Sequence, residues 1–147
     1  MAVVQSTYGD RQPKYVLGMI VDQELHNSTS RILADATPIG FGRAVFATGG
    51  AKGVTATPAV GQFEGVTIRD VVVESANADT FEQGDTMSLC EKGVIVVQTT
   101  GAVNRKEQAY VTPAGAWSNS ASGNTIIPNA FFDETIGAAG LVALRVK

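Results

Sequence analysis

Short runs rich in valine, isoleucine and threonine recur along this chain, and glycine or proline separates most of them. Within residues 65–73, Val66 and Ile68 alternate with Thr67 and Arg69 before three valines follow in succession. Alternation with a period of two is typical of a strand that buries one face, and a continuous apolar run is typical of a strand buried on both faces. The pattern therefore predicts a mainly β architecture.

Turn residues divide the chain into a series of short strands. Residues 22–36 lack a sustained helical stripe of apolar positions and leave room for a short helix. Glu91, Lys92 and Gly93 suit a hairpin loop with glycine at its left-handed position, and Gly18 suggests a bulge or a close backbone approach. Strands are expected at residues 15–21, 43–47, 65–73, 86–89, 109–111, 116–118, 130–135 and 141–146. Strands at this spacing predict an all-β sandwich or barrel, with a jelly-roll-like form as the first choice.

One domain with an N-terminal extension is expected. The chain has 147 residues, of which 44% are hydrophobic and 17% charged, as in an ordinary folded domain. Residues 1–15 differ because they are mostly polar, show no period and contain Pro13, which favours an extended backbone before it. We therefore divide the chain into an arm at residues 1–15 and a β-domain at residues 16–147. The alternative for the arm is a frayed terminus.

The arm carries side chains suited to wrapping a neighbouring protein. Fully extended, residues 2–15 would reach up to ~45 Å, enough to cross onto an adjacent subunit. The candidate contact residues are Val3, Val4, Tyr8, Arg11 and Tyr15.

The charge balance argues against nucleic acid as a partner. Lys and Arg number 11 against 14 Asp and Glu, the formal net charge is −3, and no basic run occurs. Phosphate-binding faces need clustered Lys and Arg. No stretch of roughly 18 apolar residues is present, so we expect no membrane span. The N-terminus lacks the basic start and apolar core of a secretory signal, so we expect synthesis in the cytoplasm.

The residues present predict no catalytic site and no disulfide. Cys90 is the single cysteine and His26 the single histidine, too few for the common zinc sites. Lys92 is close enough in sequence to lower the pKa of the Cys90 thiol, but a nucleophile also needs an oriented base, and His26 lies in a polar segment. We interpret Cys90 as a small strand residue.

Three apparent ligand motifs fail on spacing, so neither a cofactor nor a metal is expected. The glycines of residues 40–42 would need a third glycine where Val45 stands, and residues 50–53 lack the glycine and hydroxyl of a phosphate loop. Asp79, Glu82 and Asp85 lack the order of a calcium-binding loop. A turn in which Asp85 accepts local backbone N–H groups is favoured instead.

The adjacent aromatic residues Phe131 and Phe132 indicate an interface. Neighbours in a regular strand point to opposite faces, so one of the pair should face outward or into a subunit contact. The alternatives are that both are buried between two layers, or that exposed aromatic residues form a platform that stacks on sugars.

Several segments with strand and turn character also follow one another at regular intervals. They are Ile39-Gly40-Phe41-Gly42-Arg43-Ala44-Val45, Phe63-Glu64-Gly65-Val66-Thr67-Ile68, Gln83-Gly84-Asp85-Thr86-Met87-Ser88 and Tyr110-Val111-Thr112-Pro113-Ala114-Gly115-Ala116-Trp117, followed by Ile127-Pro128-Asn129-Ala130-Phe131-Phe132 and Gly140-Leu141-Val142-Ala143-Leu144-Arg145-Val146. In order and spacing they resemble the structural cement proteins of tailed bacteriophages, also called capsid decoration proteins. The resemblance runs from about Tyr15 to the C-terminus. Two departures are Asn104-Arg105-Lys106-Glu107, where the family has a small "A-A-G-D" turn, and Asn129, where glycine is common.

The resemblance implies a structural function rather than an enzymatic one. A protein of this kind would bind the outer surface of the phage head and stabilise contacts between neighbouring major capsid protein subunits, without a cofactor, metal, nucleic acid or membrane. Its expected state is a homo-oligomer, either a dimer or a trimer. The residues expected to shape strand approaches and turns are Gly40, Gly42, Gly65, Gly84, Asp85 and Gly93.

Two alternatives remain open at the level of the sequence. A carbohydrate-binding or adhesion β-sandwich module of a phage particle would also lack catalytic residues, but it should expose aromatic and Asn or Asp clusters. A small trimeric β-barrel enzyme would need acidic metal-binding motifs on ordered strands, and none is recognisable.

Overall fold

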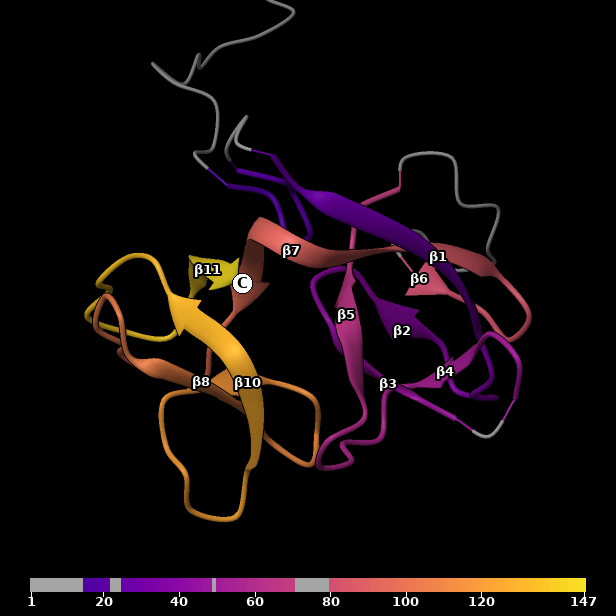
Figure 1. Ribbon diagram of the computed structural model, residues 1–147. Coiled ribbons are helices and arrows are strands. Elements are labelled where there is room, and N and C mark those ends of the chain that lie inside the picture. The colour runs from indigo at the N-terminus through magenta and orange to yellow at the C-terminus, as the bar shows by residue number, and fades with distance from the viewer. Residues whose placement is uncertain (1–14, 22–24, 49, 71–79) are drawn as a thin grey trace, which may run out of the picture.

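The computed structural model describes residues 15–21, 25–48, 50–70 and 80–147, and the arm residues 1–14 lie outside this part (Figure 1). All the regular secondary structure of the described residues consists of β-strands, which confirms the all-β prediction. The strands are β1 (Asn27–Leu33), β2 (Ile39–Gly40), β3 (Ala44–Ala47), β4 (Gly53–Thr55), β5 (Phe63–Thr67), β6 (Thr80–Phe81), β7 (Thr86–Gln98), β8 (Gln108–Val111), β9 (Trp117–Ser118), β10 (Thr125–Phe132) and β11 (Leu141–Val146). They form a nine-stranded sheet and a two-stranded sheet, β2–β6.

One end of the nine-stranded sheet closes into a small barrel. The order there is β1-β4-β3-β5-β7, and β1 also pairs with β7, from Ser28 opposite Cys90 to Ile32 opposite Thr86. The β1–β4 ladder is parallel, and the other ladders of the barrel are antiparallel. Closure removes the unpaired edges that an open sheet would expose. The barrel form of the predicted fold class is therefore the one present.

Alternation along β3 separates two hydrophobic cores. Val45 lies in the core of the barrel, whereas its neighbours Ala44 and Phe46 lie in a second core. This is the expected result of a period of two. The barrel core consists of Leu33, Ile39, Phe41, Val45, Val54, Phe81, Met87 and Leu89.

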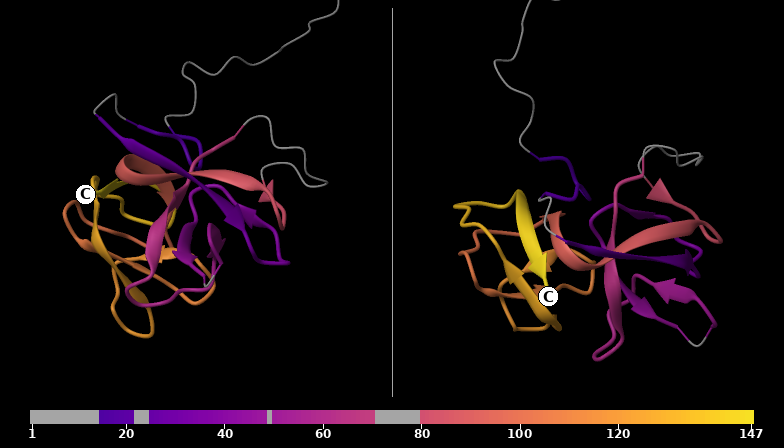
Figure 2. Two further views of the ribbon diagram at one scale, coloured as in Figure 1. Left: turned by 45° about the vertical axis from the view of Figure 1, so that its right-hand side comes forward. Right: turned by 45° about the horizontal axis from the view of Figure 1, so that its top comes forward.

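The open end of the sheet runs through β7, β11, β10, β8 and β9 and lies beside the barrel (Figure 2). The second core fills the space between them and includes Ile95, Val97, Val111, Trp117, Ile127, Phe132, Val142 and Leu144. The Trp117 side chain is 1% exposed, and its Nε1 donates to the carbonyl oxygen of Gly42 at 2.9 Å. This hydrogen bond ties β9 of the open sheet to the turn that precedes β3 of the barrel.

Strand β7 runs without interruption from the barrel into the open sheet, so the hairpin loop predicted at residues 91–93 is wrong. Its first half pairs with β1 and β5, and its second half pairs with β11 from Gly93 to Gln98. Figure 1 shows the strand changing direction between the two halves. Gly93 has a φ of 137°, and a Cβ there would lie 2.8 Å from the Cβ of His26. Glycine therefore permits a bend within a strand here, not a turn between two strands.

Two N-terminal predictions are also corrected. The short helix allowed at residues 22–36 is replaced at Asn27–Leu33 by β1, because β4 and β7 supply pairing partners that outweigh the local pattern. Residues 15–21 form a turn and a single bridge instead of a strand. The predicted close approach at Gly18 is confirmed, because a Cβ there would lie 2.6 Å from the Cβ of Phe41.

The strand predicted at residues 65–73 is shifted and shorter in the structure. Strand β5 covers Phe63–Thr67, and residues 71–73 lie outside the described part. Thr67 is fully buried at the end of β5, where its Oγ1 accepts the Arg43 N–H at 3.0 Å and donates to the Gly40 carbonyl at 2.9 Å. This threonine joins β5 to the β2–β3 turn, which explains why a polar residue interrupts an apolar run.

Two non-glycine residues of the described chain have a left-handed backbone, Lys106 with φ 73° and Asn129 with φ 60°. These residues lie at the two departures from the family pattern noted above, the turn at residues 104–107 and Asn129. Asparagine tolerates this region, whereas a lysine there costs about 1–2 kcal/mol. The Lys106 N–H donates to the Phe132 carbonyl at 2.7 Å, so contact with β10 holds the turn in this conformation.

We expect Lys106→Gly to stabilise the protein by about 0.5–1 kcal/mol. Relief of the left-handed strain exceeds the entropy that glycine adds to the unfolded chain. Arg105→Gly is the matched control, because Arg105 lies in the same turn without a positive φ, and it should destabilise the protein slightly. Urea titration of the three proteins measures the difference. Equal effects of the two substitutions would show that Lys106 is unstrained.

Candidate functional site

The single cysteine is buried in the structure. Cys90 is 0% exposed, and its Sγ donates to the Lys92 carbonyl at 3.5 Å. Burial raises the pKa of the Cys90 thiol to about 11, although a contact with the backbone of Lys92 acts in the opposite direction. A thiol in this environment stays protonated near neutral pH, which removes it as a nucleophile.

Native protein at about pH 8 should therefore resist alkylation of Cys90 by iodoacetamide, because the reagent needs an accessible thiolate. The same protein unfolded in urea should be labelled rapidly. Mass spectrometry after equal incubation times measures both. Complete labelling of the native protein within minutes would contradict the burial of Cys90.

The turn between β6 and β7 has the geometry of a structural turn. Asp85 Oδ2 accepts the Glu82 N–H at 2.7 Å, and Gly84 has a φ of 88°. Asp79, the third acidic residue of that segment, lies outside the described residues. Within the described ranges, no three His, Cys, Asp or Glu side chains form a group that could hold a metal ion. No helix in this part of the chain has the length and hydrophobicity that a membrane span requires.

Two of the other three glycines singled out from the sequence, Gly42 and Gly65, lie at close strand approaches. Gly42 has a φ of 68°, and a Cβ there would lie 2.9 Å from the carbonyl oxygen of Val96. Gly65 is buried in β5, where a Cβ would lie 3.0 Å from the carbonyl oxygen of Cys90. Gly40 lies in the short strand β2. At Gly42 and Gly65 the backbone lies closer to the backbone of β7 than any residue with a side chain would permit.

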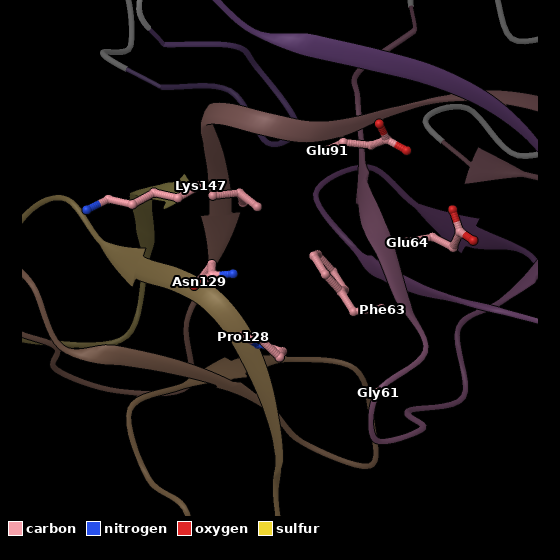
Figure 3. A pocket seen from close by; sticks show the side chains of 8 residues that line it. Gly61, Phe63, Glu64, Glu91, Pro128, Asn129 and Lys147 are labelled. Atoms are coloured by element: carbon pink, nitrogen blue, oxygen red, sulfur yellow. The ribbon is translucent and has the colours of Figure 1, made fainter.

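A pocket of about 260 Å³ opens where the barrel meets the open sheet (Figure 3). Pro128 and Asn129 of β10 face Phe63 of β5 across it. Glu64 forms a salt bridge with Arg31 at 3.3 Å. The lining consists of Gly61, Phe63, Glu64, Glu91, Pro128, Asn129, Val146 and Lys147, without a serine, cysteine or histidine. The lining therefore lacks the serine–histidine or cysteine–histidine pair of the common covalent mechanisms.

The similarity of this chain to known proteins identifies its family. The sequence matches the family described as "Structural cement protein (E217 gp24/Pam3 gp6)" over residues 4–147. The chain belongs to the phage structural cement protein family. No curated protein matches it. The family assignment confirms the resemblance that the order of the strand motifs indicated.

One solved phage structure shares the fold of this cement-family chain. A chain from the capsid of Myoviridae Phage XM1 superimposes with a TM-score of 0.75 and 16% identity, covering 100% of this chain and 98% of that chain. The head fiber gp8.5 N base of bacteriophage phi29 gives a TM-score of 0.48 and 9% identity, covering 84% of this chain and 95% of that chain. At 16% identity, the first similarity shows a common fold and nothing further.

The two aromatic residues that we singled out as interface candidates differ in burial. Phe132 is 1% exposed and belongs to the second core, whereas its neighbour Phe131 is half-buried. Phe131 is therefore the member of the pair that can reach a partner. Of the candidate arm contacts, Tyr15 is half-buried. The other four, Val3, Val4, Tyr8 and Arg11, lie outside the described residues.

A cluster of cations surrounds Phe131 and was not recognised from the sequence. Arg105 and Lys106 lie in the turn before β8, whereas Arg145 and Lys147 lie at the end of β11. Because about forty residues separate the two pairs in sequence, neither forms a basic run. The alternation along β11 could have indicated part of this cluster, because it places Arg145 and Lys147 on the face opposite Leu144 and Val146.

Proposed function

We propose that this cement-family protein binds the outer surface of an assembled phage head and stabilises contacts between neighbouring major capsid protein subunits. The family match over residues 4–147 is the observation that carries this proposal. Two observations on the described residues are in keeping with it: the cysteine is buried, and no serine, cysteine or histidine lines the pocket at the barrel junction. The protein would act as a virion component after synthesis in the host cytoplasm.

Such a function depends on the number of contacts more than on the strength of each one. A head presents many equivalent positions. A protein that contacts two subunits at each position binds with a higher overall affinity than either contact alone would give. Symmetric positions also favour a closed homo-oligomer, a dimer or a trimer. Neither a cofactor nor nucleic acid is required for this activity.

One observation disfavours the alternative of a sugar-binding module. The exposed large hydrophobic residues of the described chain are aliphatic: Val16, Leu25, Ile32, Val60 and Ile126. A stacking platform for sugars would present fully exposed aromatic rings instead. We therefore keep glycan binding as a result to be tested and not as a second proposal.

Deleting residues 2–12 should weaken binding to heads at least tenfold, about 1.4 kcal/mol, if the N-terminal arm grips an adjacent capsid subunit. The β-domain should remain folded, because the core residues within the described part of the chain all come after this segment. Sedimentation of the protein with heads measures the affinity, and thermal melting tests the fold. If the truncated protein binds with full affinity, the grip lies on the β-domain.

The stabilising function can be tested on cognate heads assembled without the protein. Adding the purified protein should raise the temperature at which these heads release their DNA, as reported by a DNA-binding dye. Heads that already carry the protein are the matched control and should show no further rise. An unchanged release temperature at saturating protein would overturn the proposed function.

A further inference from the structure

A groove of about 550 Å³ lies on the open sheet, on the side of β10 that faces away from the second core. Its residues combine one half-buried aromatic ring with several charges: Arg105, Lys106, Phe131, Phe132, Asp133, Arg145 and Lys147. Four of these side chains are cationic and one is anionic. A volume of this size is in the range that binds a small ligand or a few side chains of a partner.

The backbone holds the two walls of the groove in place. Phe131 of β10 lies opposite Arg145 of β11, so their side chains share a face of the sheet. Lys106 in the facing turn is fixed by the hydrogen bond from its N–H to the Phe132 carbonyl. Lys147 is fixed similarly, because its N–H donates to the Asn129 carbonyl at 2.8 Å. The cations therefore approach Phe131 from both sides.

The charge of the groove is only partly neutralised. Arg145 Nε contacts Asp133 Oδ1 at 3.2 Å. The Nζ atom of Lys147 lies 5.6 Å from the centre of the Phe131 ring. Within the described part of the chain, no salt bridge joins Arg105, Lys106 or Lys147 to a carboxylate. A positive groove thus occurs on a protein whose formal net charge is −3.

The backbone strain at Lys106 points in the same direction. A lysine with a φ of 73° is less stable than a glycine would be at this position. Strained residues of this kind persist where the surrounding structure holds them, and they cluster at active sites and ligand-binding sites. The side chain presented here is a cation at the rim of the groove.

We propose that this groove binds an acidic segment of the major capsid protein, with an apolar side chain of that segment against Phe131 and its carboxylates beside Arg105, Lys106 and Lys147. The proposal rests on the proposed function and adds the surface and the chemistry of its partner. Charge complementarity favours this occupant. A second copy docking the same groove across a two-fold axis would bring like charges together, since such a contact is self-complementary.

The test compares two full-length double variants with the same change in net charge. Arg105→Glu with Lys147→Glu reverses two groove cations, and Lys52→Glu with Lys92→Glu reverses two exposed lysines elsewhere. Sedimentation with heads should show affinity reduced at least tenfold for the groove variant and less than threefold for the control. Binding of the unmodified protein should weaken as salt is raised.

A second measurement separates failure of the groove from failure of the proposed function. The probe is a peptide of four glutamates and one phenylalanine, titrated into isotopically labelled protein while amide chemical shifts are recorded. Shifts should centre on Phe131 and residues 104–107 and should be absent in the groove variant. The absence of these shifts in the unmodified protein overturns the groove proposal, even if heads are bound.

The remaining outcomes are also decisive. If heads bind the groove variant as tightly as the unmodified protein, the groove proposal is wrong while the cement function stands. If heads bind neither protein but the peptide shifts occur, the acidic preference of the groove stands and its assignment to the capsid fails. If sedimentation velocity shows that only the groove variant is a monomer, the occupant is a second copy and the proposal is overturned.

Discussion

Replacement of Trp117 by alanine is expected to destabilise the protein by about 3–5 kcal/mol, the usual cost of deleting a buried aromatic side chain. Trp117 is among the largest fully buried side chains, and it lies in the core between the barrel and the open sheet. The substitution also removes the hydrogen bond to the Gly42 carbonyl. A domain stabilised by about 5–15 kcal/mol would lose a large share of its stability.

Two further variants divide this effect into its causes. Trp117→Phe keeps a large ring but leaves the Gly42 carbonyl without its donor, so we expect a loss of about 1–3 kcal/mol. Ile126→Ala is the surface control on β10, where the side chain is 42% exposed, and its effect should stay within about 0.5 kcal/mol. Urea titration measures all three. A Trp117→Ala variant as stable as the control would show that the open sheet does not depend on this contact.

Gly42→Ala should destabilise the protein by about 3 kcal/mol, because it combines a strained backbone with a steric clash. The backbone at Gly42 has a φ of 68°, and an added Cβ would lie 2.8 Å from Leu17 Cδ1 and 2.9 Å from the Val96 carbonyl oxygen. Leucine can move its terminal carbon, but the strand backbone of β7 cannot move without disturbing the sheet.

Gly123→Ala is a matched control for the backbone strain alone. Gly123 has a φ of 71°, nearly that of Gly42, and nothing lies within 4 Å of the added Cβ. We expect this variant to lose about 1 kcal/mol. The difference between the two alanine variants in thermal melting and urea titration measures the clash. Equal losses at the two positions would show that the approach of Gly42 to β7 is not tight.

The sequence was sufficient to predict those strands in which the apolar positions are the ones buried in a core. Residues 141–146 form β11 as expected, and 43–47 contain β3, because apolar residues there face a core from a regular strand. Strand β1 could not be predicted in this way. Its residues are mostly polar, and it exists because β4 and β7 bind both of its edges.

The continuity of β7 shows the limit of turn signals. Glycine at residue 93 correctly indicated a positive φ, but the same cue fits a hairpin turn and a bend within a strand. The choice depends on whether β11 pairs with the residues after the glycine, and that pairing joins segments about fifty residues apart. The groove around Phe131 was hidden for the same reason, since its cations come from two separate segments.

Imaging of decorated heads by electron cryomicroscopy is the most direct test of the central claim. Cognate heads assembled without the protein would be mixed with a saturating amount of it and reconstructed with icosahedral symmetry. We predict new density of the size of the β-domain on the outer surface, in contact with at least two neighbouring capsid subunits at each position. Heads without added density, or density that contacts a single subunit, would contradict a function in stabilising contacts between subunits.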